Sequence, residues 1–332
     1  MERVVSGVRP TGQIHLGNYF GAIRNYVRLQ EQADCFYFIA DYHSLTTHPN
    51  PADLHANVRE VLVTFLACGL DPEKATLYVQ SDQPEIPELY LILNMLAGIG
   101  ELERTVTYKE KALKQQDNLN AGLLTYPVLM TADIILHKAT KVPVGKDQEQ
   151  HLEMSRNFAN RFNFQYNCEI FPEPQGFNFG EDLVKIPGLD GTGKMGKSEG
   201  GKNAIYLGED PDSIRKKVMR AVTDAGPTGT NQPLTEPVAN LIAIMKAVSS
   251  PDTVQFFLDQ YAGGSIRYGD LKKQLAEDVV AFTAPFRERM IEISKDDALI
   301  SRTVKLGAEK ARASGSQTIK EVREAIGIKR FF

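Results

Sequence analysis

The sequence lacks tryptophan entirely and has only three cysteines among its 332 residues. Cys35, Cys68 and Cys168 are too widely spaced for a zinc knuckle or an iron–sulfur motif. Cys35 and Cys68 stand in the apolar stretches CFYFIA and FLACGL, which favour buried and reduced thiols. The cysteines therefore give no indication of a metal centre.

Long apolar runs and a strong excess of charge are missing as well. No run approaches the ~20 apolar residues of a membrane span, and the N-terminal stretch MERVV has no signal-peptide core. A net charge of −4, from 38 basic and 42 acidic residues, argues against a protein that coats nucleic acid with its whole surface. A local basic patch is still compatible with it. We expect a cytoplasmic protein with no membrane partner.

Short apolar segments alternate with helical patterns in the first half of the chain. Strands are expected at 4–8, 36–40 and 76–80, helices at about 16–27, 52–67, 86–99 and 127–137, and a late strand at 184–186. Such alternation is typical of an α/β fold with a parallel sheet. Beyond about residue 210 the pattern predicts only helices, at 212–222, 235–249, 270–295, 297–313 and 317–326.

The stretch Gly191–Ser198, GTGKMGKS, matches the phosphate-loop pattern G-x-x-x-x-G-K-[ST] and, in its first six letters, the dinucleotide pattern G-x-G-x-x-G. Both patterns require a helix that begins at the motif. Gly200 and Gly201 follow instead, and each glycine costs a helix about 1 kcal/mol relative to alanine. Lys216 also stands where a dinucleotide site needs an acidic residue for the ribose. We therefore reject both motifs.

A mobile, cationic loop is the remaining interpretation of this stretch. Its glycines allow movement, and Lys194, Lys197 and Lys202 could stabilise the developing charge of a triphosphate. A lone lysine-rich turn is more often an ordinary solvated loop. A second motif is needed to support the functional interpretation.

That second motif follows the first predicted strand. Residues 10–18 read PTGQIHLGN and place a turn, His15, Gly17 and Asn18 at the start of a helix. A helix N-terminus at the carboxyl end of a parallel strand favours anions. The letters HLGN at 15–18 resemble the HIGH motif of class I aminoacyl-tRNA synthetases, and KMGKS at 194–198 then resembles their KMSKS loop.

Two longer segments make the resemblance more specific. Residues 122–134, GLLTYPVLMTADI, and residues 142–151, VPVGKDQEQH, look like the bacterial tryptophanyl-tRNA synthetases, and the resemblance runs from about residue 3 to residue 328. It implies a Rossmann-like parallel sheet that carries the HIGH and KMSKS-type motifs, plus an all-helical C-terminal domain. The implied domains are a catalytic domain at 1–187 with a connective and dimer region at about 80–130, a KMSKS-type loop and helical anticodon-binding domain at 188–295, and C-terminal helices at 296–332 that pack back on the catalytic domain.

The resemblance also implies a reaction in two steps. L-Tryptophan and ATP give tryptophanyl-adenylate and pyrophosphate, and the tryptophan is then transferred to the 3′ end of tRNA(Trp). Such chemistry needs positioning and charge neutralisation more than a protein nucleophile. The implied ATP site consists of Arg9, Pro10, Thr11, His15, Gly17, Asn18, Gly145, Lys146, Asp147, Lys194, Met195, Gly196, Lys197 and Ser198. The implied catalytic residues are Lys194, Lys197, Lys111, His15 and Asn18, with Mg²⁺ on the triphosphate and no metal held by protein side chains.

A tryptophan site is implied in the same way, formed by Val5, Gly7, His43, Tyr126, Met130, Asp133, Val142, Val144 and Gln148. Asp133 would accept a hydrogen bond from the indole N–H. On a helix, Tyr126, Met130 and Asp133 fall on one stripe, and a carboxylate inside an apolar stripe requires a partner. Such a site would reject an analogue without the N–H by a factor on the order of 10⁴–10⁵, so no editing domain is required. For Met130, or for His43 taken alone, a structural role is the commoner one.

Three positions depart from the family pattern. Val5 stands where relatives often carry a larger aromatic residue against the indole, and Arg9 replaces the usual glutamine near the nucleotide. Gly196 replaces the serine of the lysine loop, which removes a hydroxyl donor and adds flexibility. Because Lys194 and Lys197 are kept, we expect amino-acid activation to survive.

Other functions stay open on the sequence. A tyrosine-specific sister enzyme is the nearest alternative, and the segment VPVGKDQEQH argues against it. A non-charging synthetase paralogue that binds tryptophan would not need the phosphate-binding lysines. A small-molecule nucleotidyltransferase would have no evident use for the helical domain. The resemblance further implies a homodimer through the 80–130 region, where the predicted helix 86–99 has more apolar surface than one buried face requires.

Overall fold

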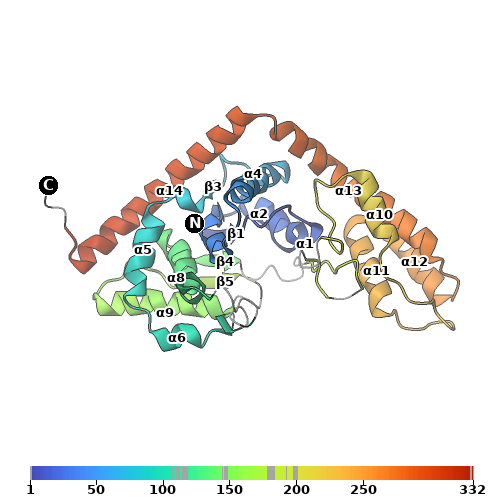
Figure 1. Cartoon of the computed structure of the whole chain (residues 1–332), viewed down its shortest axis with the longest axis horizontal. Coiled ribbons are helices and arrows are strands. Elements are labelled where there is room, and N and C mark those ends of the chain that lie inside the picture. Colours follow the sequence, from blue (N-terminus) through green and yellow to red (C-terminus); the bar gives the residue numbers. More distant parts are fainter. Residues whose placement is uncertain are drawn as a thin grey trace.

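A parallel sheet of five strands, in the order β3-β2-β1-β4-β5, organises the first half of the chain (Figure 1). The computed structural model describes residues 2–106, 108–109, 113, 119–143, 145, 149–177, 184–191, 193–196, 201–329 and 331. The strands are β1 (Arg3–Val8), β2 (Asp34–Ile39), β3 (Thr76–Val79), β4 (Lys141–Pro143) and β5 (Gln175–Phe177). The order reverses between β1 and β4, as it does in Rossmann-like folds. The predicted fold class is confirmed.

Helices cover the sheet and make up the second half of the chain. Those of the first half are α1 (Leu16–Asn18), the π-helix η1 (Tyr19–Ile23), α2 (Arg24–Leu29), α3 (Asp41–Ser44), η2 (Leu45–Thr47), α4 (Pro51–Ala67), η3 (Gln80–Asp82), α5 (Glu85–Asn94), α6 (Ile99–Glu103), α8 (Ala121–Leu136) and α9 (Glu149–Gln165). Those of the second half are α10 (Pro211–Met219), α11 (Glu236–Val248), α12 (Pro251–Ala262), α13 (Tyr268–Ile293) and α14 (Asp297–Ile326). Residues 201–329, all of them described, contain these helices and their connections, with an isolated bridge at Tyr206.

The alternation of side chains along β1 divides the core into two parts. Val4 packs on one face of the sheet in a cluster that includes Phe20 and Phe65, and Val5 packs on the other with residues of α5, α8 and α9. Neither valine is more than 2% exposed. Burial of both faces explains why consecutive residues of β1 and β2, such as Val4–Val5 and Cys35–Ile39, are apolar.

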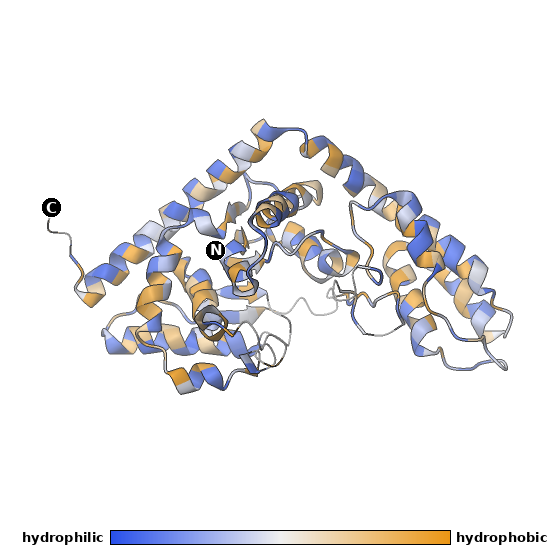
Figure 2. Ribbon diagram, in the orientation of Figure 1, coloured by the Kyte–Doolittle hydropathy of each residue, from blue (hydrophilic) through white to orange (hydrophobic). Residues whose placement is uncertain are grey.

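Two long helices join the halves of the molecule. In Figure 1, α13 and α14 form the arms of an inverted V above the sheet, with α10, α11 and α12 beside α13. Hydrophilic and hydrophobic residues intermingle along both arms (Figure 2), as expected for helices with one buried face. The core of the helical part is continuous with that of the sheet, because Ile205 and Leu207 belong to the same buried cluster as Val4. None of the described helices is both long and apolar enough to cross a bilayer.

Helix α14 lies against β3, the edge strand of the sheet. A Cβ atom built on Gly307 would stand 1.6 Å from the carbonyl oxygen of Leu77, so only glycine permits this approach. Gly315, two turns further on, is also buried. Lys310 donates to the carbonyl of Pro72, 2.8 Å away, just before the strand. The helix therefore shields an edge that would otherwise be available for pairing with another chain.

The predicted strand at 184–186 is wrong. In its place, Ile186 accepts a hydrogen bond from the N–H of Met195, 3.0 Å away, and Pro187 forms a bridge with Lys194. The segment thus forms the base of the lysine loop. The sheet is completed instead by β4 and β5, whose three residues each are too few to show an alternating pattern.

Several helices differ from their expected bounds. The helix expected at 127–137 begins at Ala121, where the side chain of Asn120 caps it, and Pro127 lies inside it. The helix expected at 86–99 is two helices, α5 and α6. The two expected at 297–313 and 317–326 are the single helix α14, and α12 has no counterpart in the prediction. Gly315 lies between the two expected helices, but α14 continues through it and the glycine packs closely on Leu136.

Replacing Gly307 with alanine should destabilise the protein, because the new methyl group collides with the backbone of β3. We expect the free energy of unfolding to fall by about 3 kcal/mol, at the upper end of overpacking effects. Gly269→Ala is the matched control, since this exposed helical glycine has no atom within 4 Å of the added carbon. It should be neutral or stabilising by up to about 1 kcal/mol. Urea unfolding checks both, and equal effects of the two variants would contradict the prediction.

Candidate active site

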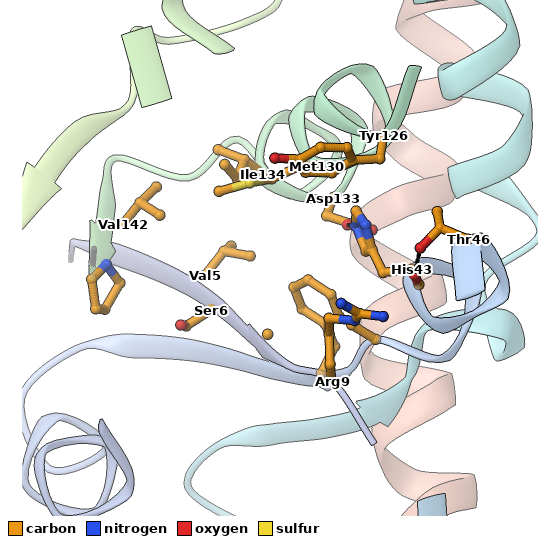
Figure 3. Close-up of a pocket in the computed structure, with 14 residues that line it drawn as sticks. Val5, Ser6, Arg9, His43, Thr46, Tyr126, Met130, Asp133, Ile134 and Val142 are labelled. Atoms are coloured by element: carbon orange, nitrogen blue, oxygen red, sulfur yellow. Dashed lines mark hydrogen bonds and ion pairs between the residues drawn. The ribbon is translucent and has the colours of Figure 1, made fainter. Parts of the chain in front are cut away.

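A cavity of about 440 Å³ opens at the carboxyl ends of β1 and β4. This is the point where the strand order reverses, and ligands of open parallel sheets bind there. The cavity is lined by Val5, Ser6, Gly7, Arg9, Phe38, Ala40, His43, Thr46, Tyr126, Met130, Asp133, Ile134, Val142 and Pro143. In Figure 3, Val5, Val142 and Ile134 lie on one side, and Arg9, His43 and Asp133 lie on the other. The site therefore combines an apolar wall with a polar end.

The polar end is built around the carboxylate of Asp133, which is completely buried. His43 Nε2 lies 2.8 Å from Asp133 Oδ2, and Gln80 Nε2 lies 2.7 and 2.9 Å from the two carboxylate oxygens. Burial raises the pKa of Asp133, and the hydrogen bond from His43 opposes that rise. Because an ionised carboxylate only accepts, His43 donates from Nε2 in this state. The pair of donors satisfies a charge that would otherwise be costly to bury.

Helix α8 supplies the side of the cavity next to Asp133. Tyr126, Met130 and Ile134 lie along this helix and face the cavity together with Asp133 (Figure 3). The hydroxyl of Tyr126 is hydrogen-bonded to the buried His151 on α9. The spacing of seven residues between Tyr126 and Asp133 therefore does place both on one stripe, as the sequence predicts.

A glycine and an aromatic ring shape the β1 side of the cavity. A Cβ atom on Gly7 would lie 2.4 to 2.9 Å from three ring atoms of Phe38. The ring of Phe38 thus lies directly against the backbone of β1 and lines the cavity there. Any larger residue at position 7 would displace that ring.

Arg9, directly after β1, lines the same cavity (Figure 3). The sequence predicts this residue only for the ATP site. Its Nε atom is buried and has no hydrogen-bond partner among the described residues. Burial lowers the pKa of this guanidinium, although Tyr126 opposes the change. A partly desolvated cation with an unused donor is suited to a carboxylate or phosphate oxygen.

Residues 14–18, which we call the His15 segment, begin the helix that follows β1. A reciprocal cap between His15 and Asn18 holds them in place. The backbone N–H of Asn18 donates to His15 Nδ1 and that of His15 donates to Asn18 Oδ1, each over 3.2 Å. The π-helix η1 follows at once, a feature often found at functional sites. On Gly17, a Cβ atom would lie 2.9 Å from His15 Nδ1 and 3.5 Å from the Cβ of Met195. The His15 segment and the lysine loop therefore meet at Gly17.

Of the stretch Gly191–Ser198, which we call the lysine loop, residues 191 and 193–196 are described. Met195 is buried, whereas Lys194 is exposed beside it. This arrangement leaves the lysine side chain accessible near the His15 segment.

The structure brings together seven of the nine residues that the sequence predicts for the tryptophan site. Val5, Gly7, His43, Tyr126, Met130, Asp133 and Val142 line one cavity, with Arg9 at its edge. Pro10 is buried in the turn after β1 and Thr11 is exposed there, while Gly145 and Gly196 are half-buried. The predicted residues Lys111, Val144, Lys146, Asp147, Gln148, Lys197 and Ser198 lie outside the described residues.

Sequence reasoning missed Gln80, the second partner of Asp133, and the lining residues Ser6, Phe38, Ala40, Thr46, Ile134 and Pro143. A signal for Gln80 was available. It is a polar residue at the carboxyl end of a predicted strand, the edge where sites of parallel sheets form. The aliphatic and aromatic residues gave no such signal, because they look like ordinary core.

The described residues contain no group of three or more histidine, cysteine, aspartate or glutamate side chains that could hold a metal ion.

Replacing Gln80 with leucine should show how the buried carboxylate is stabilised. Loss of its hydrogen bonds to Asp133 should lower the free energy of unfolding by about 2–3 kcal/mol near pH 8. Burial raises the pKa of Asp133, and below the folded-state pKa the carboxyl is protonated and needs these donors less. The loss should therefore shrink as the pH falls from about 8 toward the raised pKa of Asp133. Urea unfolding at several pH values measures it. An equal loss in the Asp133→Asn background would contradict the assignment.

Comparison with known proteins identifies the family. A model of the class I tRNA synthetases for W and Y matches residues 1–284. The tryptophan–tRNA ligase of Porphyromonas gingivalis is 60% identical over 329 residues, 99% of this chain and 100% of that one. That of Caldanaerobacter subterraneus is 40% identical over 331 residues, 99% of each chain. The tryptophanyl-tRNA synthetase of Campylobacter jejuni, solved with ADP and tryptophan, aligns with a TM-score of 0.87 at 35% identity over 98% of this chain and 99% of that one. The chain therefore belongs to the class I tRNA synthetases for tryptophan and tyrosine, and among them to the bacterial-type tryptophan–tRNA ligases.

Proposed function

We propose that the chain joins L-tryptophan to ATP to form tryptophanyl-adenylate, and then transfers the tryptophan to tRNA(Trp). The observation that carries the proposal is the buried carboxylate of Asp133 at the polar end of an otherwise apolar cavity. A flat apolar ring with one N–H donor is complementary to such a site. The similar enzyme of C. jejuni was solved with tryptophan and ADP, which supports the same pair of ligands here.

The indole ring would lie between the aliphatic side chains of Val5 and Val142 and the residues of α8, with its N–H directed at Asp133. Asp133 already accepts from His43 and Gln80, and a carboxylate has lone pairs for a further donor. A ligand without an N–H would leave that acceptor desolvated and unpaired. Discrimination would therefore come from the pocket, with no separate editing domain.

The substrate carboxylate would lie toward Arg9, where the guanidinium lines the cavity. One carboxylate oxygen attacks the α-phosphorus of ATP, and the bond from that phosphorus to the bridging oxygen of pyrophosphate breaks. Arg9 would hold the attacking group and offset the charge repulsion between carboxylate and phosphate. In this proposal Arg9 would contact both substrates, the carboxylate of tryptophan as well as the predicted ATP.

His15 and Asn18 would hold the ATP phosphates from one side, and Lys194 and Lys197 from the other, with Lys111 as a further phosphate contact. The remaining ATP contacts are those predicted from the sequence at 9–11, 17, 145–147, 195–196 and 198. Mg²⁺ would bind to the triphosphate itself and neutralise part of its charge. Pyrophosphate then leaves, and the terminal ribose hydroxyl of the tRNA attacks the carbonyl carbon of the adenylate and releases AMP.

We further propose that the chain acts in the cytoplasm as a homodimer, with the domains at 1–187, 188–295 and 296–332. The exposed apolar side chains Leu91, Met95, Ile99, Val106, Leu113 and Leu119, all within 80–130, support a dimer contact in that region. The helical part would bind the anticodon.

Tryptophan-dependent exchange of pyrophosphate into ATP tests the function, followed by charging of tRNA(Trp). We expect exchange with tryptophan and none above background with tyrosine. In Asp133→Ala, kcat/KM for tryptophan should fall by about 100-fold, because a hydrogen bond to a charged group is lost, while KM for ATP stays within about threefold. Exchange with tyrosine would favour the sister enzyme, and exchange without charging would favour the paralogue.

Alanine at Lys194 or Lys197 tests the lysine loop. If these lysines stabilise charge that develops in the transition state, kcat for exchange should fall by roughly 10²- to 10³-fold. Affinity for tryptophan should stay unchanged. It can be measured from indole fluorescence, because the chain has no tryptophan and the ligand is the only indole present. Lys185→Ala, at an exposed position before the loop, is the control. Unchanged exchange in Lys197→Ala would show that the assignment is wrong.

A further inference from the structure

The lysine loop is joined to α10 by a short buried segment, residues 203–207, which we call the return segment. Ala204, Ile205 and Leu207 in it are completely buried. The segment runs antiparallel to the residues around His15. The N–H of Leu16 donates to the carbonyl of Ile205 over 2.9 Å, and that of Leu207 donates to the carbonyl of Ile14 over 3.0 Å. His15 and Tyr206 face each other in the bridge between them.

One ion pair fixes the return segment from the side of α10. Lys217 Nζ lies 2.7 Å from Glu209 Oε1, and it donates to the carbonyl oxygen of Ala204, 2.9 Å away. The same ammonium lies 4.8 Å from the centre of the Tyr206 ring. The side chains of Lys217 and Glu209 are only 21% and 8% exposed. The pair is thus largely desolvated, and neither charge has much access to water if the other is removed.

Glu209 holds the far end of the segment in turn. Its Oε2 accepts from the N–H of Tyr206 over 3.1 Å, and its Oε1 accepts from the hydroxyl of Ser213 over 2.6 Å. A single ammonium and a single carboxylate therefore bind the segment at Ala204 and at Tyr206. Both belong to the start of the helical part of the molecule.

The return segment also meets both ends of the lysine loop. The carbonyl of Asn203 accepts from the N–H of Leu189 over 3.0 Å, at the beginning of the loop. At its end, the Tyr206 hydroxyl lies 2.7 Å from where a Cβ on Gly201 would be, and Gly201 has a φ of +74° that favours glycine. The segment therefore contacts the His15 segment and both flanks of the loop.

We propose that Lys217, together with Glu209, is a positioning residue for amino-acid activation. By fixing the return segment, the pair sets how the lysine loop faces His15 across the triphosphate. This inference rests on the proposed function and deepens it. Neither residue lines the cavity, so each acts through the backbone of the return segment. Misplacement of reacting groups by about 1 Å can lower a rate by a factor on the order of 10². A small shift of the return segment should therefore lower the rate of amino-acid activation.

Lys217→Met tests the proposal, since it keeps the aliphatic stem and removes the charge and the donor. In tryptophan-dependent exchange we expect kcat to fall by about 10- to 100-fold and KM for ATP to rise. The dissociation constant of tryptophan, measured from ligand indole fluorescence, should stay within about twofold, because the cavity is untouched. Lys217→Arg should recover most of the rate, and Glu209→Gln should show a milder loss of the same kind. Lys246→Met, an exposed lysine on α11, should behave as the parent protein does.

Hydrogen–deuterium exchange gives a readout that does not depend on activity. In Lys217→Met, amide protection should fall in residues 203–207 and in residues 14–18 together, while α8 stays protected. Loss of amide protection in the return segment alone would overturn the proposal. A rate of pyrophosphate exchange in Lys217→Met within about twofold of the parent rate would also overturn it. An equal loss of tryptophan affinity would indicate general damage to the fold and would also overturn it. Absence of pyrophosphate exchange in the parent protein would contradict the proposed function instead. The hydrogen–deuterium protection pattern would still decide whether Lys217 and Glu209 couple the return segment to residues 14–18.

Discussion

The buried carboxylate of Asp133 is the constraint on which the site depends. Its partners come from separate elements, since His43 lies on α3 and Gln80 directly follows β3. A charge in this position is tolerable only while both donors are in place. These hydrogen bonds therefore hold α8 in one position relative to α3 and to the carboxyl end of β3. The same position aligns Tyr126 and Met130 with the valines of β1 and β4, so recognition and folding depend on one set of contacts.

Much of the fold could be predicted from sequence, because long periodic segments signal their own type. The helix over 51–67 and the strands β1 to β3 follow from side-chain spacing alone. Strands of three residues such as β4 carry no period, and they exist because neighbouring strands pair with them. Gly315 and Pro127 suggest helix ends locally, but tertiary contacts keep both inside helices. Local preference was overridden where packing on distant residues decided the conformation.

For the site, the sequence was informative where a residue type is unusual for its surroundings. The carboxylate of Asp133 on the apolar stripe of α8 is such a residue, whereas His43 was singled out only by the family resemblance, and both line the cavity. Arg9 was expected near the nucleotide, and its position at the edge of the amino-acid cavity required the structure. The ion pair of Lys217 and Glu209 gave no signal, because one more lysine on a polar helix looks solvated until its neighbours are known.

The cover that α14 gives to β3 has a consequence for the order of folding. Contacts such as that from Gln83 to Ala308 span 225 residues, so they form only after most of the chain has been synthesised. During translation the edge of the sheet stays unprotected until α14 leaves the ribosome. Loop closure over such a separation slows assembly, and it makes the late step the one at risk of aggregation. A chain that lacks this thirty-residue helix would therefore keep an edge of the sheet open to pairing with the wrong partners.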